Sequence, residues 1–121
     1  LYSLLGSPSD INKDGKILLI EDLDEYLYHI DRMMMSLKRS GKLDNLKGMI
    51  VGGMSNMNDN NIPFGKTAEE IILQHTKDYD FPICFGFSAG HLDDNRAIKF
   101  GVKSKLEITA KTVILSSNIQ L

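Results

Sequence analysis

Two kinds of hydrophobic pattern follow one another in the first part of the chain. Residues 16–21, KILLIE, are apolar at nearly every position without alternation, which predicts a strand covered on both faces. From Asp24 to Ser40 the apolar side chains recur at spacings of three and four, which predicts a helix with one buried face. Asp22 or Asp24 is expected to cap the first turn of this helix, and Gly41 to end it.

The alternation of strand and helix then continues. Residues 48–53, GMIVGG, are expected to form a second buried strand. The capping box of Thr67 and Glu70 opens a second helix, which is expected to end within residues 75–78. Residues 82–87, PICFGF, are expected to form a third buried strand. Short buried strands separated by helices favour a parallel sheet with right-handed crossovers.

The pattern changes again in the last quarter of the chain. Apolar and polar positions alternate in residues 97–102 (AIKFGV), 105–109 (KLEIT) and 112–116 (TVILS), which predicts three antiparallel strands. Turns are expected near residues 101–104 and 110–111. The predicted fold class is therefore α/β, with a central, partly parallel sheet, flanking helices and C-terminal antiparallel strands.

Composition excludes several classes of protein. The 121 residues suffice for one domain, and 25% charged with 42% hydrophobic residues are ordinary values for a globular protein. A net charge of −2 without any block of Lys or Arg argues against a nucleic-acid partner. No apolar run is long enough for a membrane span, and no signal peptide is visible. The single cysteine, Cys84, cannot form an internal disulfide, which favours a reducing compartment.

The first fourteen residues differ from the rest. Residues 1–14 contain a short apolar piece followed by turn-forming residues, and we expect them to be an interdomain leader to a domain at residues 15–121. The chain opens at Leu1 without an initiator methionine, so we expect it to be cut from a longer protein. The remainder of that protein could then supply part of an active site.

Glu21 is the first candidate for chemistry. It continues the first predicted strand, and open α/β sheets place their ligands at the carboxyl ends of parallel strands. The acids that follow, Asp22, Asp24 and Glu25, are explained as residues of a helix start, where carboxylates are favoured. The alternative for Glu21 is a solvated acid at a strand end.

His91 is the second candidate, because it follows the third predicted strand by a few residues. If the strands that precede Glu21 and His91 are parallel neighbours, both side chains emerge at the same edge of the sheet. Glu21 could then accept a hydrogen bond from one ring nitrogen of His91, and the other nitrogen could take a proton from a nucleophile. The alternative is that His91 is a surface or capping histidine.

The other reactive side chains have structural explanations. His29 and His75 fall in predicted helices without metal-ligand spacing, and Cys84 falls in a predicted buried strand. No phosphate-binding glycine motif is present, so neither a metal nor an organic cofactor is expected. Ser7 and Ser88 lie in predicted turns, and no G-x-S-x-G motif occurs. An acid and a base are thus predicted without a nucleophile.

Two blocks of the sequence resemble a known family. Residues 15–53 resemble the C-terminal domain of the LD-carboxypeptidases, serine peptidases that include the microcin-immunity hydrolases: a strand ends in I-E-D, a second Glu is near, and a D/E-R helix leads to a strand of small residues. Residues 82–102 are similar to the family's G-F-x-x-G-H…N…x-x-G segment. The two blocks occur in the family's order and, with their connection, cover most of the chain from Gly15 to Val102.

The resemblance implies a Ser-His-Glu triad that is divided between two domains. Glu21 corresponds to the family's glutamate and His91 to its histidine, whereas the serine belongs to an N-terminal flavodoxin-like domain, in a G-Y-S-D-type turn that this chain lacks. The family's C-terminal domain has a swivelling β/β/α fold, and residues 1–14 look like the segment that joins the two domains. Ser88 departs from the pattern, because relatives often have proline there.

The function implied by the resemblance is that of a cytoplasmic, homodimeric peptidase. It would cut the amide between an L-configured centre and a terminal D-amino acid, releasing D-alanine from a murein tetrapeptide in peptidoglycan recycling. No metal, organic cofactor, membrane or nucleic acid is expected to take part. Two alternatives remain: hydrolysis of peptidyl-nucleotide antibiotics, and a non-catalytic binding domain in which Glu21 and His91 are relics.

Overall fold

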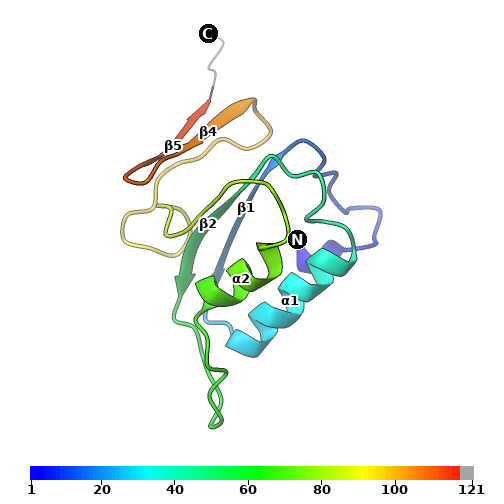
Figure 1. Cartoon of the computed structure of the whole chain (residues 1–121), viewed down its shortest axis with the longest axis vertical. Coiled ribbons are helices and arrows are strands. Elements are labelled where there is room, and N and C mark those ends of the chain that lie inside the picture. The colour runs from blue at the N-terminus through cyan, green and yellow to red at the C-terminus, as the bar shows by residue number, and fades with distance from the viewer. Residues whose placement is uncertain (118–121) are drawn as a thin grey trace.

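A three-stranded parallel sheet covered by two helices forms the body of the molecule in the computed structural model, which describes residues 1–117. The strands β1 (Ile17–Leu23), β2 (Gly48–Ser55) and β3 (Ile83–Cys84) lie in the order β1-β2-β3. The helices α1 (Leu27–Arg39) and α2 (Ala68–Thr76) lie side by side on one face of the sheet (Figure 1). The predicted α/β class with a parallel sheet is confirmed.

The core lies between this face and the two helices. The spacings of three and four in α1 place Ile30, Met34 and Leu37 on one buried stripe. They pack against residues of the sheet and of α2: Leu18, Met49, Val51, Ile71 and Ile72. Each large aliphatic side chain buried in this way stabilises the fold by about 1.5–3 kcal/mol, so the core fixes how β1 and β2 are aligned.

A two-stranded antiparallel hairpin completes the fold. Its strands β4 (Ser104–Ile108) and β5 (Val113–Ser117) pair across a turn in which Thr109 N–H donates to Thr112 O at 2.9 Å. The hairpin lies near the amino ends of β1 and β2 (Figure 1). There Leu106 reaches the sheet, since a Cβ on Gly48 would lie 3.1 Å from Leu106 Cδ2. The predicted C-terminal antiparallel strands are thus confirmed for residues 104–117.

The structure corrects the prediction for residues 82–102. The third strand ends at Cys84, because Gly86 at φ 65° turns the chain out of strand geometry. Residues 97–102 form no strand, and the turn predicted near residues 101–104 does not join two strands. An alternating pattern produces a strand only where a partner strand is available, and Phe100 in this segment is 75% exposed.

The start of α1 also differs from the prediction. Asp22 and Asp24 do not cap the helix; its N-cap is Tyr26, whose side chain makes no capping bond. Glu25 instead accepts a hydrogen bond from Tyr26 N–H at 2.8 Å and lies 2.9 Å from His29 Nδ1. The Tyr26 amide and the His29 ring lower the pKa of the Glu25 carboxyl.

The other predicted helix boundaries are confirmed. Gly41, at φ 74°, ends α1, and Lys42 N–H donates to Leu37 O at 2.8 Å, as in a Schellman motif. Thr67 and Glu70 form the capping box of α2: Glu70 N–H donates to Thr67 Oγ1 at 3.2 Å and Thr67 N–H donates to Glu70 Oε2 at 2.9 Å. Within residues 1–117, no helix is long and apolar enough to cross a membrane.

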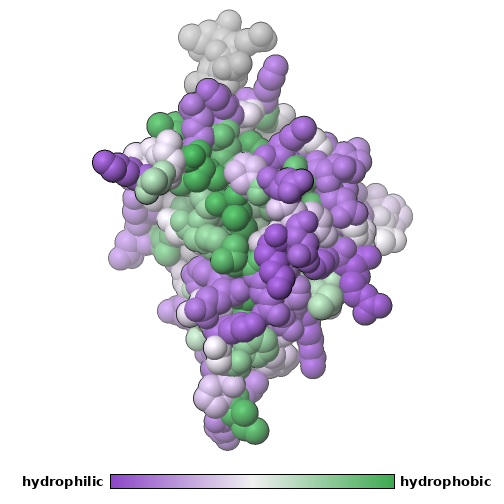
Figure 2. Space-filling model, viewed as in Figure 1, coloured by the Kyte–Doolittle hydropathy of each residue, from purple (hydrophilic) through white to green (hydrophobic). Residues whose placement is uncertain are grey.

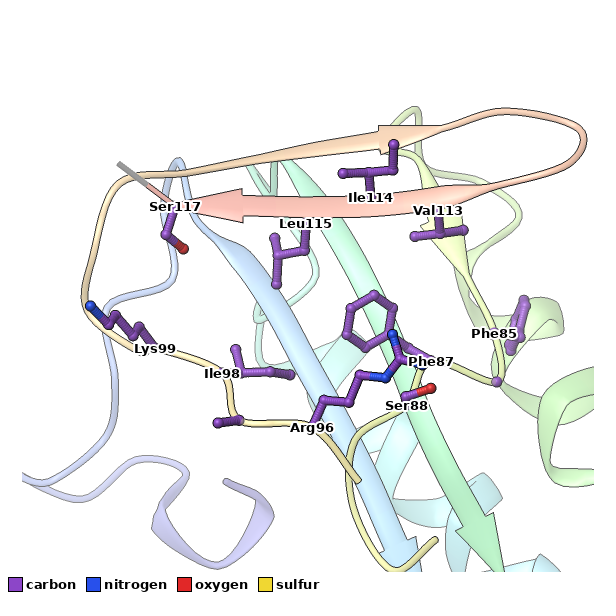
Figure 3. A pocket seen from close by; sticks show the side chains of 12 residues that line it. Phe85, Phe87, Ser88, Arg96, Ile98, Lys99, Val113, Ile114, Leu115 and Ser117 are labelled. Atoms are coloured by element: carbon purple, nitrogen blue, oxygen red, sulfur yellow. The ribbon is translucent and has the colours of Figure 1, made fainter. Parts of the chain in front are cut away.

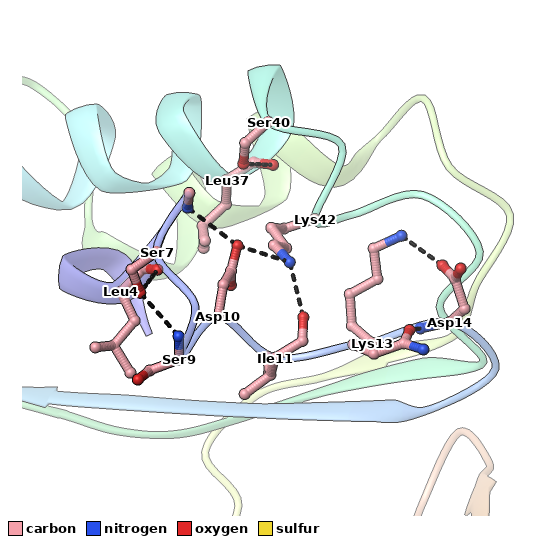
Figure 4. A network of polar contacts seen from close by, with 12 residues as sticks. Leu4, Ser7, Ser9, Asp10, Ile11, Lys13, Asp14, Leu37, Ser40 and Lys42 are labelled. Carbon is pink, nitrogen blue, oxygen red and sulfur yellow. Dashed lines mark hydrogen bonds and ion pairs between the residues drawn. The ribbon is translucent and has the colours of Figure 1, made fainter.

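A polar cluster helps to fix the N-terminal segment to the domain (Figure 4), together with the packing of Leu5 against the core. Asp10 Oδ2 accepts hydrogen bonds from Gly6 N–H at 3.2 Å and from Lys42 Nζ at 3.0 Å. Lys42, which follows α1, also donates to Ile11 O at 2.7 Å. The Lys42 ammonium lowers the pKa of the Asp10 carboxyl. Residues 1–14 therefore pack on the domain, and their role as an interdomain leader stays a prediction.

Replacing Asp10 with Asn is expected to lower the Tm at pH 7 and to have little effect near pH 2. The folded state holds the pKa of Asp10 below its unfolded value of about 3.9. The carboxylate therefore stabilises the fold above that pH, and this contribution is lost as the pH falls through the lowered folded value. Thermal melts of wild type and variant at both pH values test this. Asp78→Asn is the control, because the Asp78 side chain is 64% exposed and its ion pair with Lys38 lies at the surface, where such pairs contribute little; an equal effect of both changes would contradict the expectation.

Candidate active site

Glu21 lies at an irregularity near the carboxyl end of β1. Ile20 pairs with Val51 in β2, but Asp22 pairs with Met54, so β2 contains one extra residue opposite Glu21. Such bulges redirect side chains and often occur beside active sites. The expected position of Glu21, on the strand-end edge of the parallel sheet, is observed.

The loop after β3 runs beside β2, on the side on which β3 pairs with it. Phe87 N–H donates to Val51 O at 3.1 Å, and Gly53 N–H donates to Ala89 O at 2.8 Å. Alternate residues of the loop thus continue the ladder of β3 beyond its last strand residue. This attachment carries His91 to the end of β1.

Two glycines allow the loop to come this close. A Cβ on Gly52 would lie 2.4 Å from the carbonyl oxygen of Ala89. Gly90 has φ 104°, and a Cβ there would lie 2.6 Å from Glu21 Oε2. Any larger residue at either position would collide with the loop or with the glutamate.

Glu21 and His91 contact each other where the loop passes the end of β1. His91 Nδ1 lies 3.0 Å from Glu21 Oε2. Because an ionised carboxylate only accepts hydrogen bonds, Nδ1 is the donor in this contact, and in the neutral imidazole Nε2 then keeps its lone pair. The side chain of His91 is 57% exposed and that of Glu21 32% exposed. Among residues 1–117 nothing hydrogen-bonds to Nε2, so this nitrogen can act on a group brought from outside.

The serines considered in the sequence are not placed to be activated by His91. Ser7 donates to Leu4 O at 2.7 Å within the N-terminal segment. Ser88 donates to Asp94 Oδ2 at 3.1 Å, and Asp94 also pairs with Arg96 at 2.8 Å. The Arg96 guanidinium, with Ser88, lowers the pKa of the Asp94 carboxyl. In the part of the chain that the structure describes, no hydroxyl hydrogen-bonds to the imidazole.

The remaining candidates have structural partners. His29 pairs with Glu25, and His75 Nε2 lies 2.7 Å from Asp31 Oδ1, which joins α2 to α1. Cys84 is a buried core side chain, and this burial raises the pKa of its thiol. Residues 1–117 contain no group of three or more His, Cys, Asp or Glu side chains that could hold a metal ion.

Open space lies on both sides of the His91 loop. A cavity of about 450 Å³ has Glu21, Gly90, Asn95 and Arg96 in its wall and lies beside the dyad of Glu21 and His91. Another of about 610 Å³ lies between residues 85–88, residues 96–99 and β5 (Figure 3), and contains neither member of the dyad. Glu21, but not His91, lines the first of these cavities.

Comparisons with known proteins show the family of this chain. The family model of the LD-carboxypeptidase C-terminal domain matches residues 1–106. The chain belongs to this family. A probable murein peptide carboxypeptidase of Bacillus subtilis (strain 168) is 33% identical over 123 residues, covering 98% of this chain and 37% of the relative. A putative carboxypeptidase of Synechocystis is 30% identical over 112 residues, 90% of this chain and 36% of the relative.

Solved structures show the same fold. The crystal structure of muramoyltetrapeptide carboxypeptidase from Oxalobacter formigenes superposes with a TM-score of 0.83 at 24% identity, over 94% of this chain and 40% of that one. The microcin C7 self immunity protein superposes with a TM-score of 0.59 at 20% identity, over 71% of this chain and 26% of that one. This LD-carboxypeptidase domain therefore spans less than half the length of these relatives.

In this LD-carboxypeptidase domain, Gly52→Ala is expected to be destabilising by about 1–3 kcal/mol, because the new methyl collides with the backbone of Ala89. Gly53→Ala is the matched control. A Cβ there would lie 2.7 Å from Leu92 Cγ, but Leu92 is 39% exposed and its side chain can rotate away. Denaturant unfolding of both variants tests the difference. Equal losses of unfolding free energy in the two variants would contradict the inference that the close contact of Gly52 with the Ala89 backbone requires glycine.

Proposed function

We propose that this chain is the C-terminal catalytic half of a serine LD-carboxypeptidase that releases D-alanine from murein tetrapeptides in peptidoglycan recycling. The observation that carries the proposal is the 3.0 Å contact of Glu21 with His91 at the edge of the sheet, with Nε2 open to solvent. The names of the Bacillus and Oxalobacter relatives support the substrate class.

The proposed reaction divides the triad between two domains. Nε2 of His91 takes the proton of a serine hydroxyl, supplied by an N-terminal domain, as the serine oxygen attacks the carbonyl carbon of the scissile amide. The imidazolium then gives that proton to the leaving amino group of D-alanine, and an acyl-enzyme remains. His91 next removes a proton from a water whose oxygen attacks the acyl carbon. It returns that proton to the serine oxygen as the ester bond breaks and the shortened peptide leaves with a new carboxylate. Glu21 stays ionised throughout and stabilises the imidazolium.

The setting of the enzyme belongs to the same proposal. A protein that recycles released murein peptides would work in the cytoplasm, and the single buried cysteine suits a reducing compartment. We propose a homodimer as the assembly. The substrate's third residue would contact the N-terminal domain.

The chain of residues 1–121 alone is expected to release no D-alanine from a murein tetrapeptide, because His91 has no nucleophile to activate. Amino-acid analysis after prolonged incubation checks this, with the intact enzyme as the positive control. Release by the chain at the rate of the intact enzyme would overturn the division of the triad.

A second candidate is the hydrolysis of peptidyl-nucleotide antibiotics. Its support is the fold shared with the microcin C7 self immunity protein, which has been solved with aspartyl sulfamoyl adenosine. Kinetics of the intact protein on a murein tetrapeptide and on an aminoacyl sulfamoyl nucleoside separate the two functions. A higher kcat/KM on the nucleoside would favour the second.

A further inference from the structure

We propose that Ser55 is a positioning residue that holds the Glu21–His91 dyad in register, an inference that rests on the proposed function. Ser55 is the last residue of β2 and lies between the two segments that carry the dyad. Its carbonyl accepts from Asp24 N–H at 2.9 Å, in the residue that follows the end of β1, three positions after Glu21. Its hydroxyl donates to the carbonyl of His91 at 2.7 Å. Ser55 therefore connects the backbone that follows Glu21 to the backbone of His91.

The Ser55 hydroxyl extends the ladder between the His91 loop and β2. The earlier bonds of this ladder are made by backbone groups, at Phe87 and at Ala89. The next alternate residue of the loop is His91. There the chain turns away from β2, and the following amide, Leu92 N–H, donates to Gly90 O at 3.0 Å within the loop. A side chain then replaces the backbone donor on β2, and its target is the peptide group of His91 itself.

Asn95 holds the other side of the same dipeptide. Its side-chain oxygen accepts from Gly90 N–H at 3.1 Å. The N–H of Gly90 and the carbonyl of His91 are thus both hydrogen-bonded to side chains, those of Asn95 and Ser55. Because the His91 side chain is 57% exposed, packing does little to fix the ring. The two backbone anchors and Glu21 together define where Nε2 points.

Loss of the Ser55 hydroxyl should misplace the base without removing it. In the intact protein, Ser55→Ala is expected to lower kcat for D-alanine release by about 10- to 100-fold, the effect of a displacement near 1 Å, while KM changes little. Ser55→Thr keeps the hydroxyl and should retain most of the activity. Ser40→Ala is the matched control, because the Ser40 hydroxyl also donates to a backbone carbonyl, that of Leu37 at 3.1 Å, but in α1.

Asn95 provides an independent pair of variants in an exposed loop. Asn95→Ala removes the acceptor for Gly90 N–H and should lower kcat in the same direction. Asn95→Asp keeps an acceptor oxygen and should be closer to wild type. This pair tests the anchor even if Ser55→Ala fails to fold.

A second readout does not depend on turnover. The ¹⁵N chemical shifts of the His91 ring report which nitrogen carries the proton; wild type should show the proton on Nδ1. Ser55→Ala should reduce that population, and Ser55→Thr should restore it. Unchanged kcat together with unchanged ring shifts in Ser55→Ala and Asn95→Ala would overturn the inference. If His91→Ala retained full activity while Ser55→Ala still altered the ring shifts, the proposed function would fail and the positioning role would stand.

Discussion

Replacing His91 with alanine in the intact protein is expected to lower kcat for D-alanine release by about three to six orders of magnitude, as for members of catalytic triads elsewhere. The change removes the group that would take the serine proton. It should leave the fold intact, because the imidazole is more than half exposed and contacts Glu21 at the surface. Steady-state kinetics with a purified murein tetrapeptide give the measurement.

His29→Ala is the matched control for this variant. His29 also pairs with a glutamate, Glu25, but at the start of α1. Turnover near the wild-type rate is expected, with a small loss of stability. If His91→Ala and His29→Ala were equally active, the pair of Glu21 and His91 would be a relic in a binding domain.

Changing Glu21 to glutamine is expected to lower kcat by about three to four orders of magnitude. The amide has the size of the carboxylate, so the contact with His91 can persist. When the amide donates to Nδ1, the ring proton moves to Nε2 and the base is lost. The amide also cannot stabilise the imidazolium. Far-ultraviolet circular dichroism should be unchanged, and ring ¹⁵N shifts should show the altered tautomer.

Asp22→Asn separates this effect from a general loss of negative charge at the strand end. Asp22 is adjacent to Glu21, and its Oδ1 accepts from its neighbour Leu23 N–H at 2.8 Å, away from the imidazole. This variant should keep nearly full kcat. Comparable losses in Glu21→Gln and Asp22→Asn would favour the interpretation of Glu21 as an ordinary solvated acid.

Features set by short-range interactions were predicted well from the sequence. The buried stripe of α1, its end at Gly41 and the capping box of Thr67 and Glu70 depend on residues three to five positions apart. The strand predicted at residues 97–102 was wrong, because alternation is a local property but pairing requires a distant partner. The cap predicted for α1 at Asp22 or Asp24 was also wrong, because Asp24 adopts φ 57° and the helix begins only at Leu27, after Tyr26.

In the candidate site, too, only some of the features could be predicted from the sequence. The meeting of Glu21 and His91 could be anticipated in part, because the carboxyl ends of parallel strands share one edge of a sheet. The two strands are not neighbours as the prediction supposed, since β2 lies between β1 and β3, and the loop after β3 brings His91 back to Glu21. The parts played by Gly52 and Ser55 could not be anticipated. Gly52 is one small residue in an apolar strand, and Ser55 opens a polar loop in the sequence. Gly52 and Ser55 acquire these roles only because the loop that carries Ala89 and His91 packs against β2. A serine two residues after the glycine pair of β2 was the available signal.

The narrow clearance at Gly52 and Gly90 also affects how relatives of this protein can be judged. A homologue could retain both the glutamate and the histidine and still be a pseudoenzyme, if either glycine had been exchanged for a bulkier residue. Surveys that score active members by their reactive side chains alone would count such a protein as functional. Checking the two glycines beside the reactive pair would identify it from the sequence.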